Sequence, residues 1–316
     1  MSFSRREFVA RLAATGAAAA LPVGFPARAE IHPPLAALAQ LGGSGAANLR
    51  IGYAAITWSG HNTQAIDDIS SLGYSGIQLL ANATTDFPDP HRLRDLLAQH
   101  NLTFVALSSG TAPLDPAQRQ DTIERHAAHA KYLHEAGGLY LQVIGAGAKD
   151  GQSYTEADYR YEGELLTEIG KRAAGIGVQT GFHNHMHTIG QTPQAVAAIL
   201  AASDPQYVKF ELDVAHYLQG GGDPAAAIHT YAGRLLFMHL KDVRNAQNSN
   251  GYEFVELGHG RVNFPAIFAA LTQVSFSGWG IVELDAVPLG ANRTPKQCAA
   301  ISQEYLERID SIQGLN

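Results

Sequence analysis

Residues 178–216 read VQTGFHNHMHTIGQTPQAVAAILAASDPQYVKFELDVAH, and this stretch decides the fold. Apolar runs at 178–184 and 208–214 predict two buried strands, and the pattern between them predicts a helix. Thr192 precedes Pro193, so a capping side chain stands ahead of a proline that suits the first helical turn. A strand, a helix and a second strand in this order indicate a βαβ unit with two parallel strands.

The same unit repeats along the rest of the chain. Each apolar run is followed by a helical pattern, and Asp-Pro or Thr-Pro pairs open several of the helices. Eight such units in about 260 residues predict an α/β fold, a single-domain (β/α)8 TIM barrel over residues 49–316. The expected strands are 50–57, 75–80, 102–108, 139–144, 178–184, 208–214, 235–241 and 279–284.

The first 29 residues have the pattern of an export signal. Ser4-Arg5-Arg6-Glu7-Phe8-Val9 is a twin-arginine motif, an alanine-rich apolar run follows it, and Ala27-Arg28-Ala29 forms a cleavage site. The alternative is an amphipathic helix that happens to start with two arginines. We expect a twin-arginine signal peptide at 1–29, a linker or N-terminal arm at 30–48, and a periplasmic or secreted protein.

The net charge and the cysteine content limit which partners and which disulfides the protein can have. The chain has 22 Lys+Arg and 29 Asp+Glu, and removing residues 1–29 takes away four arginines and one glutamate, which changes the formal charge from −7 to −10. This balance disfavours nucleic acid and anionic membranes, and the N-terminal apolar run is too short for stable membrane insertion. The single cysteine, Cys298, excludes an internal disulfide. A homo-oligomer is compatible with the composition, which does not decide the oligomeric state.

Polar residues end four consecutive predicted strands, where a (β/α)8 barrel carries its chemistry. Alternate residues of a strand share one face, so imidazoles and carboxylates from these strands are expected to meet at one mouth. This mixture suits a divalent ion of the Mn, Co, Zn or Fe type better than Mg. The four strand ends are His183-Asn184-His185, Glu211-Leu212-Asp213, His239-Leu240-Lys241 and Glu283-Leu284-Asp285.

Histidines elsewhere lack such a constellation. His126, His129 and His134 lie in the helical pattern before the fourth strand, and we expect them on a solvated helix face. A histidine at one strand end is commonly a satisfied polar residue, so the functional prediction depends on four adjacent strands ending alike.

Seven short motifs follow one another at barrel spacing: Gly73-Tyr74-Ser75-Gly76-Ile77-Gln78, Phe182-His183-Asn184-His185, Glu211-Leu212-Asp213-Val214-Ala215-His216, Gly220-Gly221-Gly222-Asp223-Pro224, His239-Leu240-Lys241-Asp242, Gly258-His259-Gly260-Arg261-Val262-Asn263-Phe264 and Val282-Glu283. Together they resemble the sugar phosphate isomerase/epimerase superfamily, the xylose isomerase-like barrels. The resemblance covers about residues 50–310 and is specific for the superfamily rather than for a substrate.

The resemblance implies one divalent metal ion, held by Glu, Asp, His and Glu on strands five to eight. Asp213, His239 and Glu283 match the last three positions. The strand-five position holds His183, and some relatives also read His-Asn-His there, so the implied set is two histidines and two carboxylates. In the ketose epimerases the missing glutamate is also one acid/base of a pair, of which only Glu283 remains.

The shared chemical step of such enzymes is removal of a proton next to a carbonyl, with a divalent cation stabilising the enolate. Glu283 is the expected base, and ligation alone is its alternative role. His185 and His216 are candidates for a second acid/base or for binding hydroxyls. Lys241 either contacts a substrate oxygen or forms a rim ion pair with Asp242. One base suffices for β-elimination, so the missing glutamate favours a lyase or dehydratase.

Three further residues are expected to bind substrate. Trp58 offers a stacking face, with a core or rim position as the alternative. Gln78 stands where relatives often carry Glu and can bind a hydroxyl without taking its proton. Arg261 lies in the long segment 243–263, which we expect to be a functional loop. An exported protein meets non-phosphorylated carbohydrates, so the expected substrate is a keto-sugar, keto-glycoside or inosose.

Two other functions compete with an isomerase, epimerase or lyase. A non-catalytic periplasmic sugar-binding protein on a degenerate barrel would also explain the missing glutamate. The endonuclease branch of the superfamily needs additional His and Glu ligands and a basic groove, which the acidic charge disfavours.

Overall fold

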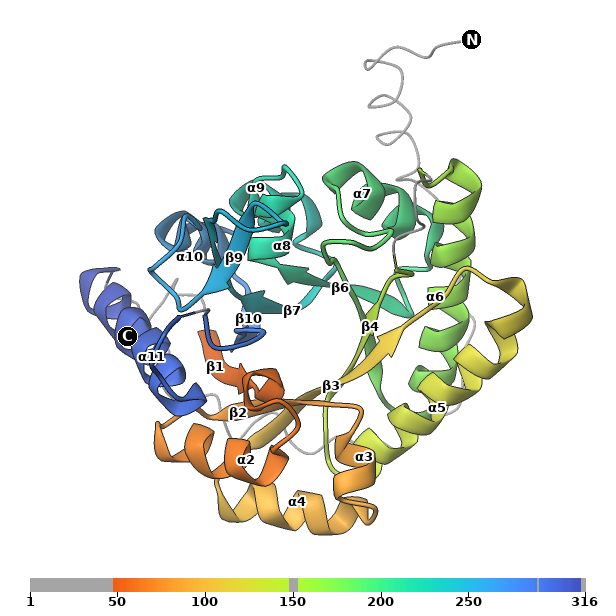
Figure 1. The fold of residues 1–316 in the computed structure, drawn as a ribbon. Coiled ribbons are helices and arrows are strands. Elements are labelled where there is room, and N and C mark those ends of the chain that lie inside the picture. Colours follow the sequence, from red (N-terminus) through yellow and green to blue (C-terminus); the bar gives the residue numbers. More distant parts are fainter. Residues whose placement is uncertain (1–47, 148–152, 289, 314–316) are drawn as a thin grey trace. The chain divides into compact units, whose positions relative to one another are not determined.

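The computed structural model describes residues 48–147, 153–288 and 290–313. The predicted signal peptide and all but the last residue of the predicted arm lie outside these ranges. Eight parallel strands close into a barrel in the order β1-β10-β7-β6-β5-β4-β3-β2, and helices surround it (Figure 1). The predicted single-domain (β/α)8 barrel is confirmed. Within the described residues, no helix is both long and apolar enough to span a bilayer.

All eight strands lie within a few residues of their predicted positions. They are β1 (Asn48–Ala54), β2 (Gly76–Leu80), β3 (Thr103–Thr111), β4 (Tyr140–Ile144), β5 (Gln179–His183), β6 (Val208–Asp213), β7 (Leu235–Leu240) and β10 (Ser277–Val282). The longer helices are α2 (Asn62–Ser71), α4 (Pro90–Gln99), α5 (Arg119–Glu135), α6 (Glu156–Ile176), α7 (Pro193–Ala202), α9 (Pro224–Tyr231), α10 (Phe264–Gln273) and α11 (Pro295–Gln313). Short helices are η2 (Ala55–Trp58), α3 (Ala83–Asp86), η3 (Pro116–Gln118) and α8 (Val214–Gln219).

The capping residues predicted before prolines open their helices as expected. The side chains of Asp89, Asp115, Thr192 and Asp223 each accept a hydrogen bond from a backbone N–H in the first turn, and each is followed by proline. Such a cap stabilises a helix by about 1 kcal/mol. The helix starts are therefore set locally, and with them the ends of the loops that line the mouth.

The prediction of a loop over 243–263 was wrong for its first half, which is a β-hairpin. Strand β8 (Asp242–Asn245) pairs antiparallel with β9 (Tyr252–Val255). The turn contains Asn250-Gly251, and Gly251 has φ +74°, a conformation that favours glycine. An Asn-Gly pair is a hairpin signal that was present in the sequence. The hairpin places aromatic side chains of β9 over the barrel mouth.

The lower part of the barrel is filled by apolar side chains. Trp279 of β10 reaches past β1 to Gly76 of β2, where an added Cβ would lie 2.6 Å from both the Trp279 ring and Val105 of β3. These strands are not all neighbours, so the indole points into the interior. The floor is therefore mainly apolar, although the buried indole N–H of Trp279 and the Arg50 guanidinium, 4.3 Å from the Trp279 ring, also lie there.

The prediction of a solvated face for three histidines of α5 was wrong for His126. Its side chain is fully buried, and its Nδ1 lies 2.5 Å from the Ser109 hydroxyl at the end of β3. His129 is half-buried, with its Nδ1 2.8 Å from the same hydroxyl, and His134 is exposed as expected. The helical pattern gave the wrong burial for His126 because it cannot show that Ser109, on another element, provides a buried hydrogen-bond partner.

One buried carboxyl predicts a pH-dependent stability. Glu162 of α6 is fully buried, and burial raises its pKa to about 8, against the lowering effect of a hydrogen bond with the Ala146 backbone. The folded chain thus holds a proton that the unfolded chain releases above its ordinary pKa of 4.5. Stability should therefore fall as the pH rises from about 4.5 to 8, by a few kcal/mol.

Glu162→Gln should remove this part of the pH dependence, so its stability advantage over wild type should grow between pH 5 and 8. Urea unfolding at several pH values measures it. Glu164→Gln, an exposed change on the same helix, should run parallel to wild type. A Glu162→Gln curve parallel to wild type would contradict the assignment.

Candidate active site

A polar layer crosses the barrel interior above the apolar floor. Gln78 of β2 lies 3.4 Å from Gln142 of β4, whose amide donates to Glu211 of β6 at 2.6 Å. His239 of β7 completes the layer, with its Nε2 2.8 Å from Glu211 Oε1 and 2.9 Å from Gln78 Oε1. Both neighbours accept, so Nε2 carries a proton and Nδ1 points to the other side.

On that other side, three predicted ligands come together. His239 Nδ1 lies 3.3 Å from Glu283 Oε1 and 3.6 Å from Asp213 Oδ2, and the three ligand atoms lie within 4.8 Å of one another. Strand register causes this, because Asp213 is paired with His239 and the Glu283 N–H donates to the Leu240 carbonyl. Asp213 and His239 are fully buried, whereas Glu283 is 6% exposed, so Glu283 is the carboxylate nearest the mouth.

His183, the fourth predicted ligand, belongs to an adjoining group. Its register partner is Glu211, two residues before Asp213, so it lies beside Glu211 at 3.4 Å. His183, Glu211 and His239 form a second candidate metal-binding group, and His239 belongs to both groups. The predicted ligands are thus divided between two adjoining sets.

The donor atoms fit a metal ion. At this site, four buried side-chain atoms have no hydrogen-bond partner among the described residues: His183 Nδ1, Glu211 Oε2, Asp213 Oδ2 and His239 Nδ1. Buried polar atoms without partners are costly unless something else binds them. Imidazole nitrogens mixed with carboxylate oxygens are ligands for Zn, Mn, Fe or Co. The residues present therefore match the implied divalent cation.

The local charges suit the same interpretation. Burial, with neighbouring histidines, holds the pKa of His183 well below its ordinary value, so this imidazole stays neutral and keeps one nitrogen lone pair free for a metal ion. Burial would also lower the pKa of His239, but the carboxylates of Glu283 and Glu211 raise it well above its ordinary value. His239 therefore sits in a strongly negative environment, which is the environment that a cation requires.

Lys241 is buried completely in the same cluster. Its Nζ lies 3.0 Å from Glu283 Oε1 and 2.5 Å from Asp285 Oδ1. The alternative of an ion pair with Asp242 was wrong. Asp242 instead accepts four backbone N–H bonds from 243, 258, 260 and 262 and so organises the loop after the hairpin.

His185 and His216 stand together at the rim of the cluster. Their ring centroids are 3.9 Å apart, and they form a third candidate group with His183. His216 is buried and lies 3.1 Å from Lys241 Nζ, whereas His185 is half-buried. His185 is thus the imidazole that a substrate can reach, as expected for an acid/base or hydroxyl-binding residue.

Aromatic side chains of the hairpin cover this region and were missed in the sequence. The Phe254 ring lies 4.2 Å from Lys241 Nζ and 4.8 Å from the His216 ring centroid. Tyr252 packs edge-on against Phe254, and its hydroxyl lies 3.1 Å from His187 Nε2. Phe254 is only partly buried, so its ring separates the buried Lys241 ammonium from the mouth of the barrel.

Two predicted substrate-binding residues do not reach the cluster. Trp58 is 4% exposed, packs on Tyr53 and donates its indole N–H to Asp68 at 2.9 Å, so little of its ring is available for stacking. The exposed Arg261 hydrogen-bonds to Gln219 at the end of α8. Gln78 does lie in the interior, but its oxygen faces His239, so it acts through that histidine.

Glu211 gives a direct prediction. Its carboxylate contacts His239 Nε2 opposite the predicted metal face, and carboxylates in that position orient ligating histidines and raise their basicity. Glu211→Gln should lower metal affinity by about 10–100-fold, measured by competition with a chelating dye. Glu253→Gln, which removes the exposed pairing with Arg244, should leave affinity unchanged. Equal affinity of Glu211→Gln and wild type would argue against this role.

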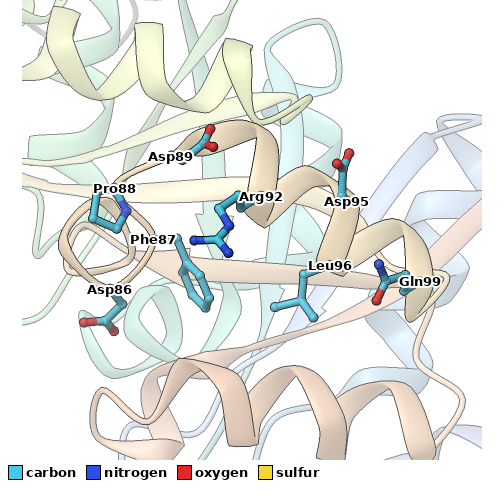
Figure 2. A pocket seen from close by; sticks show the side chains of 8 residues that line it. All are labelled: Asp86, Phe87, Pro88, Asp89, Arg92, Asp95, Leu96 and Gln99. Atoms are coloured by element: carbon cyan, nitrogen blue, oxygen red, sulfur yellow. The ribbon is translucent and has the colours of Figure 1, made fainter.

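A separate cavity of about 570 Å³ lies over α3 and α4, away from these residues (Figure 2). Its lining includes Asp86, Asp89 and Asp95, with Arg92 directed toward the Phe87 ring. None of the predicted site residues lines it. It therefore has no part in the candidate active site.

Known proteins show the same architecture. The family model of the xylose isomerase-like TIM barrel matches residues 66–309. The inosose dehydratase of Geobacillus kaustophilus is 27% identical over 299 residues, covering 82% of this chain and 94% of its own. The IolI protein, solved with a bound zinc, has a TM-score of 0.71 at 16% identity, covering 83% of this chain and 98% of its own. The probable 3-DHS dehydratase AsbF of Bacillus anthracis has a TM-score of 0.66 at 18% identity, over 82% and 99%. With a family match over most of its length, the chain belongs to the xylose isomerase-like TIM barrel family.

Proposed function

We propose that this protein is a metal-dependent carbon–oxygen lyase that removes a proton next to the carbonyl of a non-phosphorylated keto-sugar, keto-glycoside or inosose. One observation carries the proposal: Asp213, His239 and Glu283 converge, with Lys241 bound to Glu283. That the chain is an enzyme of this superfamily follows from its relatives, which include several inosose dehydratases and structurally similar epimerases. The finer assignment to a lyase is our inference.

Asp213, His239 and Glu283 would hold the metal ion, with His183 as the fourth candidate. A divalent cation of the Zn, Mn, Co or Fe type supplies positive charge that stabilises an enolate oxygen. The bound zinc of the structurally similar IolI protein supports this choice of metals. Glu211 and Gln78 orient His239 from behind through Nε2.

Glu283 is the group best placed to take the proton. It is the most exposed member of the three-ligand group, at 6% against 0% for Asp213 and 1% for His239. Burial alone would raise its pKa, but His239 and Lys241 hold it well below the ordinary value, so it stays a carboxylate. The Lys241 ammonium lies beside it and can stabilise negative charge developing on the substrate oxygen.

His185 is the candidate acid for the departing oxygen. The proton leaves carbon for Glu283, the C–O bond at the next carbon breaks, and the oxygen leaves with a proton from His185 as water or an alcohol. An unsaturated ketone remains, with no change in overall redox state. A two-base epimerisation would need a second base, and with His183 in place of the strand-five glutamate a histidine would have to serve as that base.

We also propose export as the reason for a substrate without phosphate. The twin-arginine motif at 4–9 would deliver the folded protein to the periplasm, where free sugars and glycosides are more common than sugar phosphates. Fractionation of cells expressing the full chain and an Arg5→Lys, Arg6→Lys variant tests this. Equal cytoplasmic retention of both would overturn it.

The activity is tested by incubating the metal-loaded protein with Mn²⁺ and a panel of 3-keto-glycosides, inososes and free ketoses in deuterated water. NMR should show an unsaturated product and deuterium exchange at the carbon next to the carbonyl. Glu283→Gln, which keeps the size of the side chain, should abolish both. If no substrate shows deuterium exchange or gives a product, the proposed proton abstraction is wrong.

A further inference from the structure

Two cavities hollow the barrel mouth beside the candidate active site. One of about 700 Å³ is lined by the loops after β1 and β10, including Ser59, His61, Gln64 and Ala286. The other, of about 490 Å³, is lined by the loops after β1, β2 and β3, including Asn82. Ser59 lines both. The cavities are therefore adjacent, and the loop after β1 separates them.

The larger cavity is tied to the strand end that carries the proposed base. Ala286 and Val287 line it and directly follow Asp285. The hydroxyl of Thr57, another lining residue, donates to the Leu284 carbonyl at 2.5 Å. Leu284 lies between Glu283 and Asp285, so the backbone segment that carries the proposed base continues directly into the wall of this cavity.

The wall between the cavities is held in place before any ligand binds. Trp58 hydrogen-bonds to Asp68, which also pairs with Lys296 at 3.4 Å. Ser59 adopts φ +52°, uncommon for a residue other than glycine. Preorganised walls reduce the entropy lost on binding. Trp58 also lines the larger cavity, but only 4% of its surface is exposed, so it acts here mainly as a structural support.

The lining chemistry defines the ligand. Among the residues that line the two cavities, none is Asp, Glu, Lys or Arg. Ser59, His61 and Gln64 are exposed and offer donors and acceptors, beside apolar surface from Val287. The cavity over α3 and α4, by contrast, carries three aspartates and an arginine. A neutral, hydroxyl-bearing group matches this lining, whereas a phosphate or carboxylate does not.

We infer that these cavities bind a second, neutral unit of the substrate, so that the natural substrate is a keto-glycoside rather than a single ring. The inference rests on the proposed function. The volume of the larger cavity lies within the range of about 300–1,000 Å³ found for small-molecule sites.

Glu283 takes the proton next to the ketone, the glycosidic C–O bond breaks, and the departing oxygen is protonated. The keto ring becomes an unsaturated ketone, and the second unit leaves as a neutral alcohol.

Comparing the kinetics of a 3-keto-disaccharide with those of a single-ring inosose distinguishes binding of the second unit from binding of the reacting ring. Ala286→Phe should fill the cavity and raise KM for the disaccharide by about tenfold or more, with inosose kinetics unchanged. Gln64→Ala, an exposed polar deletion, should act in the same direction. Gln99→Ala, an exposed glutamine in the cavity of Figure 2, is the matched control and should change neither.

Binding keeps the inference testable if no turnover is seen. Calorimetry on Glu283→Gln should show tighter binding of the 3-keto-disaccharide than of the single-ring ketone, and Ala286→Phe should remove the difference. Turnover of both substrates without any effect of Ala286→Phe or Gln64→Ala would overturn the second unit and leave the lyase standing. Absence of turnover with the binding difference intact would overturn the lyase and keep the cavity assignment.

Discussion

Asp213→Asn should lower metal affinity by at least about 100-fold and bring turnover below detection, while the barrel stays folded. The two oxygens of Asp213 have separate roles: Oδ1 accepts the His216 backbone N–H at 2.8 Å, and Oδ2 is buried without a partner. An asparagine keeps its oxygen toward the N–H, because a flipped amide would set two donors against each other. Its NH₂ group then replaces Oδ2 and cannot bind a cation.

The measurement is metal content by elemental analysis and affinity by competition with a chelating dye. Asp223→Asn is the matched control, since Asp223 also caps a helix with Oδ1 but is exposed. It should bind metal as wild type does. Unfolding of the metal-free Asp213→Asn variant should stay close to wild type, so that lost affinity is not lost structure. Full metal content in Asp213→Asn would remove Asp213 from the ligand set.

The barrel could be predicted because its signals are local. Each strand is a short apolar run, several helices begin with their own capping side chain, and parallel order follows from the alternation of strands and helices. The three-ligand group could be predicted for a related reason: strand ends in a closed barrel meet at one rim, and side-chain parity selects the residues that face inward. Parity left Glu211 and Asp285 open as well, and the resemblance to the superfamily selected Asp213, His239 and Glu283.

The positions of His183, Glu211 and Trp58 could not be predicted, because they depend on strand register and on contacts with residues elsewhere in the chain. His183 pairs with Glu211 and not with Asp213, and a register shift between Phe210 and Glu211 in the β6–β7 pairing is not visible in the sequence. Glu211 shares its strand face with Asp213, so parity pointed to it, but its contact with His239 required the fold. The burial of Trp58 likewise depends on Asp68, ten residues away.

Lys241→Met should destabilise the metal-free protein by about 3–5 kcal/mol, the cost of leaving a buried charge without its partner. Lys241 contributes the ammonium that Glu283 and Asp285 share at 3.0 and 2.5 Å, in a cluster that also contains Asp213 and Glu211. Methionine is unbranched and one atom shorter than lysine, so it should fit the space under Phe254. What it removes is the positive charge.

The loss should be smaller when the protein is saturated with Mn²⁺, because a cation held by Glu283 neutralises the carboxylate that Lys241 leaves unpaired. Urea unfolding with a chelator and with excess Mn²⁺ measures both states. Lys171→Met, which removes an exposed pairing with Glu168, should change little in either. If Lys241→Met lowers the free energy of unfolding equally in both states, Lys241 and the metal act on different carboxylates. That result would contradict the shared role of Glu283.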